Sequence, residues 1–359
     1  MNEIDNNKNI IIIMFIILGI VIMLYLLIKI LLNTNKNPTK KYTKSPKSKK
    51  SEKSVRSIVT HSLLGKRGDT GNQIFQIACV VAAAKRSNAK VVLPAISKLA
   101  ITNMFNLEKY PQKNIIIDKS FHEYDNYEKI IIPEDGKTYD IRGYRQAYKY
   151  FEDCSEDIRE LFTPKQYIID TMRKILPKKY IAVHIRKGDY IKMMHNVPPL
   201  REFKICKLEY YKQGIKRLKK DYPDYPVLVC TDSPDFVKPL LKQLGATLSP
   251  SCKKLSPKIS DFCTMYLSDA LIISNSTFSW WSAYLRTKRK IICPTPWWDP
   301  SGVIGNMVGL DGPYLHYPKW TLLDSETGRF VRGPYGKKGN RKVKKNVPDI
   351  CRFIRGMVV

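Results

Sequence analysis

The sequence predicts an α/β protein with two halves, each a parallel sheet covered by helices, that face a cleft and follow one transmembrane helix. Three observations support this fold class. Residues 10–32 form an apolar run that is interrupted only by Gly19, Tyr25 and Lys29. A polar and strongly basic segment follows this run. From residue 57 onward, short apolar stretches typical of buried strands alternate with longer stretches typical of helices, which indicates doubly wound parallel sheets.

The apolar segment 10–32 has the length of a membrane anchor. A helix rises about 1.5 Å per residue, so this segment spans a hydrocarbon core of roughly 30 Å. It is also longer than the apolar core of a signal peptide. We therefore expect a short N-terminal tail at 1–9, a signal-anchor helix at 10–32 and a flexible stem at 33–56. The Lys, Ser, Thr, Pro and Asn residues of the stem bury little apolar surface.

The first half is expected at residues 57–178. It begins with a strand, a loop that contains Gly65, Gly68 and Gly71, a helix and a second strand. Weaker strand signals and two helical stretches follow. The expected strands are 57–63, 89–93, 114–117 and 129–132, and the expected helices are 73–85, 152–162 and 166–176.

The second half, residues 179–325, shows the same alternation more clearly. Pro239 is expected to delay or bend the helix that contains it. The expected strands are 180–185, 226–230, 270–274 and 290–293, and the expected helices are 207–220, 235–244, 260–267 and 278–286. Residues 326–359 are expected to form a basic C-terminal tail.

The net charge of +30 first suggests a polyanionic partner. Segments 36–56 and 326–359 each carry a net charge of +8, so more than half of the excess lies in the stem and the tail. The remainder is still basic, which suits a phosphate-bearing ligand without requiring nucleic acid. The cysteines and histidines lack metal-site spacing and no Asp-x-Asp occurs, so no metal is expected.

Polar clusters follow several predicted strands at their carboxyl ends, where parallel sheets bind ligands. These clusters are 186–189, 231–232 and 275–279, and the loop 65–72 is expected to face them across the cleft. Arg186 is the best candidate to neutralise a phosphate, because its guanidinium is planar, permanently charged and bidentate.

Two of these segments allow more than one interpretation. The side-chain oxygens at 275–277 can cap the helix that follows, or the free N–H groups at its start can bind an anion. The glycines at 65–71 are spaced G-x-x-G-x-x-G, which differs from the dinucleotide fingerprint. They form either a flexible connection or a loop whose backbone N–H groups approach a phosphate.

Five motifs in chain order resemble the α-1,2-fucosyltransferases, glycosyltransferase family 11. The motifs are GNQIFQIA (71–78), GYRQAYKYFED (143–153), VHIRKGDY (183–190), CTDSPDF (230–236) and SDALIISNSTFSWWSAYL (268–285). The resemblance covers residues 57–323. The last motif is highly specific, whereas α-1,6- and protein O-fucosyltransferases share a version of the H-x-R-x-x-D element at 184–189.

The resemblance implies a GT-B fold of two Rossmann-like domains, 57–178 on the acceptor side and 179–325 on the GDP-fucose side. It implies a membrane-anchored galactoside α-1,2-fucosyltransferase that moves L-fucose from GDP-fucose to the 2-hydroxyl of galactose in a glycan, with inversion and without a metal or other cofactor. A single-pass membrane protein of the secretory pathway, in the Golgi or ER, is expected. The basic stem favours a cytoplasmic body by the positive-inside rule, so the orientation stays open.

The resemblance also implies roles for particular residues. Arg186 would bind the diphosphate and stabilise the departing GDP, and Asp261, eight residues before Asp269, would accept hydrogen bonds from guanine. Lys187 is a departure, because most relatives have a second Arg there and Lys lacks the bidentate fork. The full set of expected donor-binding residues is Arg186, Lys187, Asp261, Asn275, Ser276, Thr277, Gly71, Asn72 and Gln73.

The expected catalytic residues are Arg186, Asp189 and His184. Asp189 and His184 are nearest in sequence to the place of a general base, but Asp189 can instead orient the basic residues, so the base stays open. Several aromatic residues are candidates for sugar stacking, with core packing the stronger interpretation for Trp280 and Trp281. These aromatic residues are Tyr144, Tyr148, Trp280, Trp281, Trp297 and Trp298.

Two alternatives to this function remain. The first alternative, within the same enzyme class, is an α-1,6- or protein O-fucosyltransferase. From another class, it is a membrane-tethered basic protein that binds nucleic acid or anionic lipid, which accounts for the charge but not for the five ordered motifs. The expected partners are GDP-fucose, a glycan acceptor and the membrane, with no nucleic acid.

Overall fold

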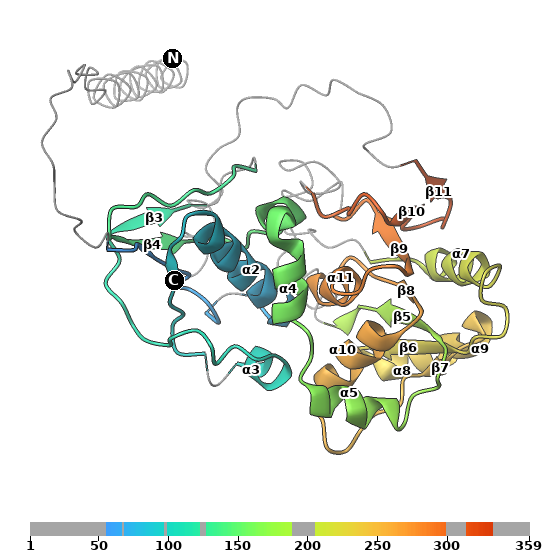
Figure 1. Cartoon of the computed structure of the whole chain (residues 1–359). Coiled ribbons are helices and arrows are strands. Elements are labelled where there is room, and N and C mark those ends of the chain that lie inside the picture. The colour runs from blue at the N-terminus through green and yellow to red at the C-terminus, as the bar shows by residue number, and fades with distance from the viewer. Residues whose placement is uncertain are drawn as a thin grey trace, which may run out of the picture. The chain divides into compact units, whose positions relative to one another are not determined.

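The computed structural model describes residues 55–66, 68–96, 99–122, 127–188, 205–298 and 314–332 (Figure 1). All of them belong to one compact unit, Lys53–Val359. The predicted anchor at 10–32, most of the stem and the tail beyond residue 332 lie outside the described residues. Within the described ranges, no helix is long and apolar enough to cross a membrane. The prediction of an anchor therefore stays a prediction.

The first sheet has four parallel strands in the order β2-β1-β4-β3. The strands are β1 (Ile58–Thr60), β2 (Lys90–Val91), β3 (Lys119–Phe121) and β4 (Thr138–Ile141). Their helices are α2 (Thr70–Arg86), α3 (Ala100–Met104), α4 (Ser155–Leu161) and α5 (Gln166–Arg173), with the 3-10 turns η1 (Tyr148–Tyr150) and η2 (Glu152–Cys154). The sequence correctly predicts the opening strand, loop, helix and strand of this sheet.

The two weaker strand predictions in this half are wrong. Segments 114–117 and 129–132 are not strands, and the sheet instead uses β3 and β4. Apolar content was misleading, because Ile116 is 88% exposed and Ile131 is 55% exposed. The real strand β4 contains the fully buried Asp140, whose carboxylate accepts hydrogen bonds from the backbone N–H and the hydroxyl of Ser62.

The second sheet has seven strands in the order β11-β10-β9-β8-β5-β6-β7, all parallel except the antiparallel pair of β10 and β11. The strands are β5 (Ile181–Ile185), β6 (Val227–Thr231), β7 (Thr247–Leu248), β8 (Ala270–Ile272), β9 (Lys290–Thr295), β10 (Thr321–Asp324) and β11 (Phe330–Val331). The chain runs outward from β5 to β7, returns to β8 on the other side of β5, and then runs outward to β10. This is the doubly wound arrangement, and the order reverses between β5 and β8.

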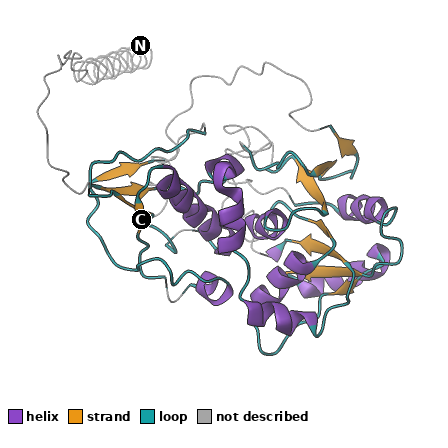
Figure 2. Cartoon of the chain, viewed as in Figure 1, coloured by secondary structure: helices purple, strands orange, loops and turns teal. Residues whose placement is uncertain are grey.

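Helices flank the strands of this second sheet (Figure 2). They are α7 (Leu208–Leu218), α8 (Pro234–Val237), α9 (Leu241–Leu244), α10 (Pro257–Leu267) and α11 (Thr277–Tyr284), and the 3-10 turn η3 (Lys238–Leu240) joins α8 to α9. Pro239 lies in η3, so the predicted helix 235–244 is broken at its proline as expected. The α/β class with parallel sheets is thus confirmed.

Helices between the two sheets share one hydrophobic core. Figure 1 shows α2, α4 and α11 between the sheets, and α2 packs on both of the others. The ring of Phe75 in α2 lies 4.7 Å from that of Trp280 and 4.8 Å from that of Trp281 in α11. Both tryptophans are fully buried, so their interpretation as core residues is confirmed.

Candidate active site

Two of the predicted polar clusters meet at the reversal of the second sheet. Strand β5 ends at Ile185 and leads into Arg186, and β8 ends at Ile272 and leads into the start of α11. The two strands pair directly, with Val183 opposite Ile272. Doubly wound sheets bind ligands outside the carboxyl ends of the strands at such a reversal. The fold therefore places Arg186 and the start of α11 on the edge where a ligand is expected.

The turn after β5 is held by a carboxylate from the neighbouring strand. Arg186 Nη1 lies 2.9 Å from Asp232 Oδ2. The backbone N–H of Lys187 donates to Asp232 Oδ1 at 3.1 Å, and that of Gly188 donates to Oδ2 at 3.2 Å. Sequence analysis places Asp232 on this edge but gives it no role. The missed signal is its position directly after a buried strand that pairs with β5.

Lys187 occupies the position where the sequence departs from the family that it resembles. Its ammonium lies over the ring of Phe236, and burial lowers the pKa of Lys187 below its usual value. This is a cation–π arrangement rather than a bidentate contact. The contact with Phe236 explains how the turn accommodates a lysine at this position. The expected contact of Lys187 with the donor stays a prediction.

His184 lies on β5 and is 3% exposed. Its Nδ1 shares a hydrogen bond of 2.8 Å with Ser274 Oγ, which links β5 to the segment after β8. Burial, and then the charge of Arg186, lower the pKa of His184 to about 3. Such an imidazole is a weak base at neutral pH. We therefore interpret His184 as a group that joins the two strands, and Asp189, the other candidate base, lies outside the described residues.

The start of α11 holds three of the predicted donor-binding residues. Asn275 is 3% exposed, and its Nδ2 donates to the carbonyl of Trp297 at 3.2 Å. Ser276 is the N-cap residue, but its side chain makes no capping hydrogen bond. The hypothesis that the side chain of Ser276 caps α11 is therefore wrong. The backbone N–H of Ser276 donates to the carbonyl of Ser274 at 2.8 Å, so an anion at this helix start would use the N–H groups that follow it, and the contact of Ser276 and Thr277 with the donor stays a prediction.

The first turn of α2 meets the first turn of α11. Helix α2 begins at Thr70, three residues earlier than predicted, because Asp69 accepts a hydrogen bond of 2.7 Å from the Thr70 N–H. Gly71 thus belongs to the helix and not to a loop. A Cβ atom on Gly71 would lie 2.5 Å from the carbonyl carbon of Thr277. Two helix N-termini therefore approach each other with only a glycine between them.

Hydrogen bonds hold the other residues of this first turn. Gln146 Nε2 donates to Asn72 Oδ1 at 2.8 Å, which orients the amide of Asn72. Gln73 Nε2 donates to the carbonyl of Gly68 at 3.3 Å. Lys258 of α10 pairs with Asp69 at 2.6 Å, so the cap of α2 is joined to the second half of the chain.

Asp261 lies on α10 near the carboxyl ends of β6 and β7. Ser249, the residue after β7, donates from its hydroxyl to Asp261 Oδ1 at 2.7 Å. Burial raises the pKa of Asp261 to about 6. A partly buried carboxyl with a raised pKa on the ligand-binding edge of a sheet is a candidate for a binding group.

The remaining aromatic candidates divide by exposure. Trp297 is 1% exposed and Tyr148 is 3% exposed, so neither has a face for a sugar, and the hypothesis of stacking is wrong for both. Tyr144 is 41% exposed and Trp298 is half-buried, so both retain accessible surface. In the described part of the chain, no group of three or more His, Cys, Asp or Glu residues is arranged to hold a metal ion.

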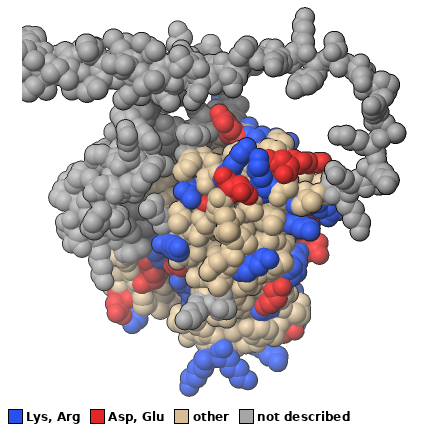
Figure 3. Space-filling model, turned by 90° about the vertical axis from the view of Figure 1, so that its left-hand side faces the viewer, with Lys and Arg blue, Asp and Glu red and all other residues tan. Residues whose placement is uncertain are grey.

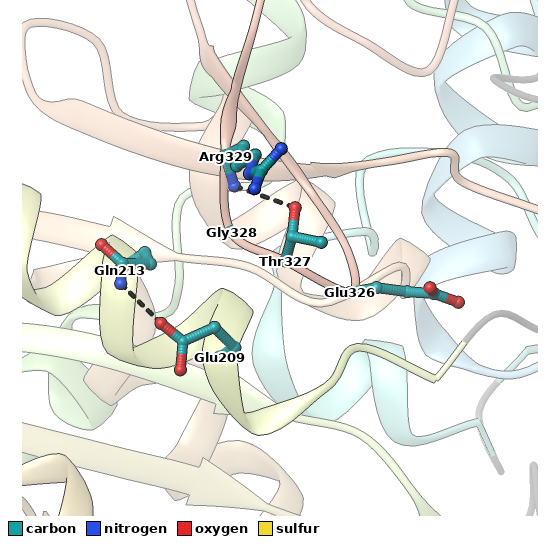
Figure 4. Close-up of a pocket in the computed structure, with 6 residues that line it drawn as sticks. All are labelled: Glu209, Gln213, Glu326, Thr327, Gly328 and Arg329. Atoms are coloured by element: carbon teal, nitrogen blue, oxygen red, sulfur yellow. Dashed lines mark hydrogen bonds between the residues drawn. The ribbon is translucent and has the colours of Figure 1, made fainter.

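A pocket between α7 and the turn from β10 to β11 contains none of the predicted site residues. It is lined by Glu209, Gln213, Glu326, Thr327, Gly328 and Arg329 (Figure 4). Gly328 has a φ of 68°, and a Cβ atom there would lie 2.7 Å from Gln213. We interpret this pocket as the packing of a tight turn on α7, separate from the edge that carries Arg186.

Comparison with known proteins identifies the class and then the family. The model described as "Glycosyl transferase family 11" matches residues 27–301, which is more than half of the chain. The protein is therefore a glycosyltransferase. It belongs to glycosyltransferase family 11, so the predicted family and the predicted class of enzyme are confirmed.

The curated relatives include a colitosyltransferase and several galactoside fucosyltransferases. An α-1,2-colitosyltransferase of Escherichia coli is 28% identical over 65% of this chain and 90% of its own length. A galactoside α-(1,2)-fucosyltransferase 2 of Pongo pygmaeus is 21% identical over 77% of this chain and 82% of its own length.

Solved structures of fucosyltransferases also match in part. POFUT1 in complex with GDP-fucose gives a TM-score of 0.42 at 13% identity, over 67% of this chain and 98% of that one. Fucosyltransferase NodZ from Bradyrhizobium gives 0.42 at 14% identity, over 66% and 94%.

Proposed function

We propose that this enzyme transfers L-fucose from GDP-fucose to the 2-hydroxyl of galactose in a glycan, with inversion at the anomeric carbon and without a metal. The observation that carries the proposal is Arg186 at the reversal of a doubly wound sheet, beside the start of α11. The donor and the linkage come from the motifs and from the fucosyltransferases among the relatives. We further propose the GT-B arrangement, with residues 57–178 on the acceptor side and 179–325 on the donor side, and the anchor at 10–32.

The proposed mechanism is stabilisation of the leaving group by fixed charge. The diphosphate of the donor lies between Arg186 and the first turn of α11, where a cation and a helix N-terminus act together. The first turn of α2 adds a second helix N-terminus at the same place. Negative charge that develops on the departing GDP is met by donors that are already oriented. The galactose hydroxyl approaches from the opposite face of the fucose ring.

The alternative of a basic binding protein is not favoured. Membership of a glycosyltransferase family accounts for the ordered motifs. On the face shown in Figure 3, acidic and basic side chains of the described residues are also interspersed.

An acceptor assay with linkage analysis tests the proposed reaction. The full chain is incubated with GDP-fucose and three acceptors: a β-galactoside, an N-acetylglucosamine-terminated glycan and a folded domain with Ser and Thr hydroxyls. We expect fucose on galactose O2, read by NMR of the product. Transfer to a 6-hydroxyl or to a protein hydroxyl would contradict the linkage. GDP-colitose, which lacks the sugar 3-hydroxyl, is the matched donor, and preferential turnover of it would contradict fucose as the natural sugar.

The proposed contact of Asp261 with guanine predicts a pH dependence. A carboxylate accepts hydrogen bonds from the guanine N–H groups only when it is ionised. Because the pKa of Asp261 is raised to about 6, the ionised form dominates above that pH and is lost below it. We expect kcat/KM for GDP-fucose to be constant above pH 6 and to fall by up to about tenfold per pH unit below it.

Two variants make this pH test specific to Asp261. Asp261→Asn should lower kcat/KM at pH 7.5 and remove the fall below pH 6. Ser249→Ala removes a hydrogen bond that stabilises the carboxylate, so it should move the inflection to higher pH. A wild-type profile that stays flat from pH 5 to 7.5 would exclude the guanine contact.

A further inference from the structure

We propose that Asp232 is a positioning residue that holds Arg186 and the turn after β5 in the geometry that receives the donor's diphosphate. This inference rests on the proposed function of the same site. Asp232 directly follows β6, which pairs with β5 over its whole length, with Ile185 opposite Thr231. The residues that follow the two strands are therefore neighbours on the ligand-binding edge. The carboxylate is thus carried by the first residue after a buried strand.

Both oxygens of Asp232 serve the turn after β5. Oδ1 accepts the N–H of Lys187 at 3.1 Å, while Oδ2 accepts the N–H of Gly188 at 3.2 Å and pairs with Arg186 Nη1 at 2.9 Å. Successive backbone N–H groups that converge in this way form a concave site for an anion. The turn is therefore folded around the carboxylate, and loss of Asp232 would leave its geometry undetermined.

The contact through Nη1 orients the guanidinium of Arg186. A guanidinium is planar and carries five N–H donors in a fixed fork, so an ion pair through Nη1 constrains the direction of the plane. A bidentate contact with phosphate depends on that direction. Asp232 would then act on the donor through Arg186 and not by direct contact.

The size of the turn and the exposure of the pair fit this role. A Cβ atom on Gly188 would lie 3.0 Å from Asp232 Oδ2, so the chain passes close to the carboxylate. The side chains of Arg186 and Asp232 are 26% and 23% exposed. A partly exposed ion pair adds little to stability because water screens it. Removal of Asp232 should therefore change donor binding more than it changes folding.

A competing role for Asp232 predicts the opposite result. Its carboxylate pairs with Arg186 and accepts hydrogen bonds from two backbone N–H groups. These are the kinds of donor that bind phosphate. If Asp232 occupied the place of the phosphate, its removal would strengthen the binding of GDP. If it positions Arg186, its removal weakens that binding.

The experiment measures GDP affinity by calorimetry and donor kcat/KM in the full chain. Asp232→Asn, which keeps the size and loses the charge, should weaken GDP binding and lower kcat/KM by about 10- to 100-fold, the range for a hydrogen bond to a charged group. The matched control is Asp235→Asn, in the same segment, whose 92% exposed carboxylate pairs only locally with Lys238. It should stay within about twofold of wild type.

A double substitution tests whether Asp232 acts through Arg186. In an Arg186→Ala background, Asp232→Asn should lower kcat/KM by less than about threefold, because a positioning residue has nothing left to position. The same loss in both backgrounds, wild-type values for Asp232→Asn, or tighter GDP binding would each overturn the inference. Failure of the unmodified chain to bind GDP would instead overturn the proposed function, so the two failures are distinguishable.

Discussion

Replacing Arg186 with alanine is expected to lower kcat for fucosyl transfer by about 10²- to 10³-fold, the loss that follows removal of one oriented donor from a developing anion. The structure places Arg186 at the reversal between β5 and β8 and fixes its guanidinium against Asp232. Its charge is therefore oriented before the donor arrives, and the benefit is largest when negative charge forms on GDP. Steady-state rates with saturating donor and acceptor measure this effect.

Two further variants separate orientation from charge. Arg186→Lys keeps the positive charge but loses the planar fork, so its kcat should lie between those of wild type and Arg186→Ala. Arg217→Ala removes a guanidinium from α7 that lies over the ring of Phe330, away from the ligand-binding edge, and should leave kcat unchanged. Near-normal turnover by a folded Arg186→Ala enzyme would exclude the proposed role, and thermal unfolding of each variant shows whether it is folded.

Four strands of the second sheet were predictable because their pattern is local, whereas β7, β10 and β11 were not predicted. Strands β5, β6, β8 and β9 are mostly apolar, as expected for parallel strands buried on both faces, and their observed bounds differ from the predicted ones by two residues or fewer. In β4, by contrast, the buried Asp140 interrupts the apolar pattern. Its partner Ser62 lies 78 residues away, so the compensation that makes this strand stable is invisible in the local sequence.

The sequence predicts which residues share the edge of the sheet but not the contacts between them. Arg186 and the start of α11 lie together because the carboxyl ends of parallel strands share one edge, which follows from strand direction alone. The link from Arg186 to Asp232 depends on β6 being the neighbour of β5, and strand order is a property of the whole sheet. Burial also depends on the whole fold. The pKa of His184 is low, and Trp297 has no exposed face for a sugar, because surrounding elements cover both side chains.

Replacing Gly71 with alanine is expected to destabilise the fold and the active site together. The added Cβ would lie 2.5 Å from the carbonyl carbon of Thr277 and 2.6 Å from the backbone nitrogen of Phe278. Backbone atoms cannot rotate away as a side chain can, so α2 and α11 must separate. We expect a loss of about 1–3 kcal/mol in the free energy of unfolding, the usual cost of overpacking, measured by denaturant titration.

The same substitution should lower donor kcat/KM by more than the unfolded fraction explains. Movement of α11 displaces the N–H groups of its first turn, and it also disturbs the packing of Trp280 and Trp281 against Phe75. Gly214→Ala is the matched control: it also lies in a helix, but its new Cβ would meet the terminal carbon of the Ile272 side chain at 2.9 Å. That side chain can adjust, and alanine favours the helix by about 1 kcal/mol, so stability should change little. If Gly71→Ala were as well tolerated as Gly214→Ala, the close approach of the two helix N-termini could not be what orients the diphosphate site.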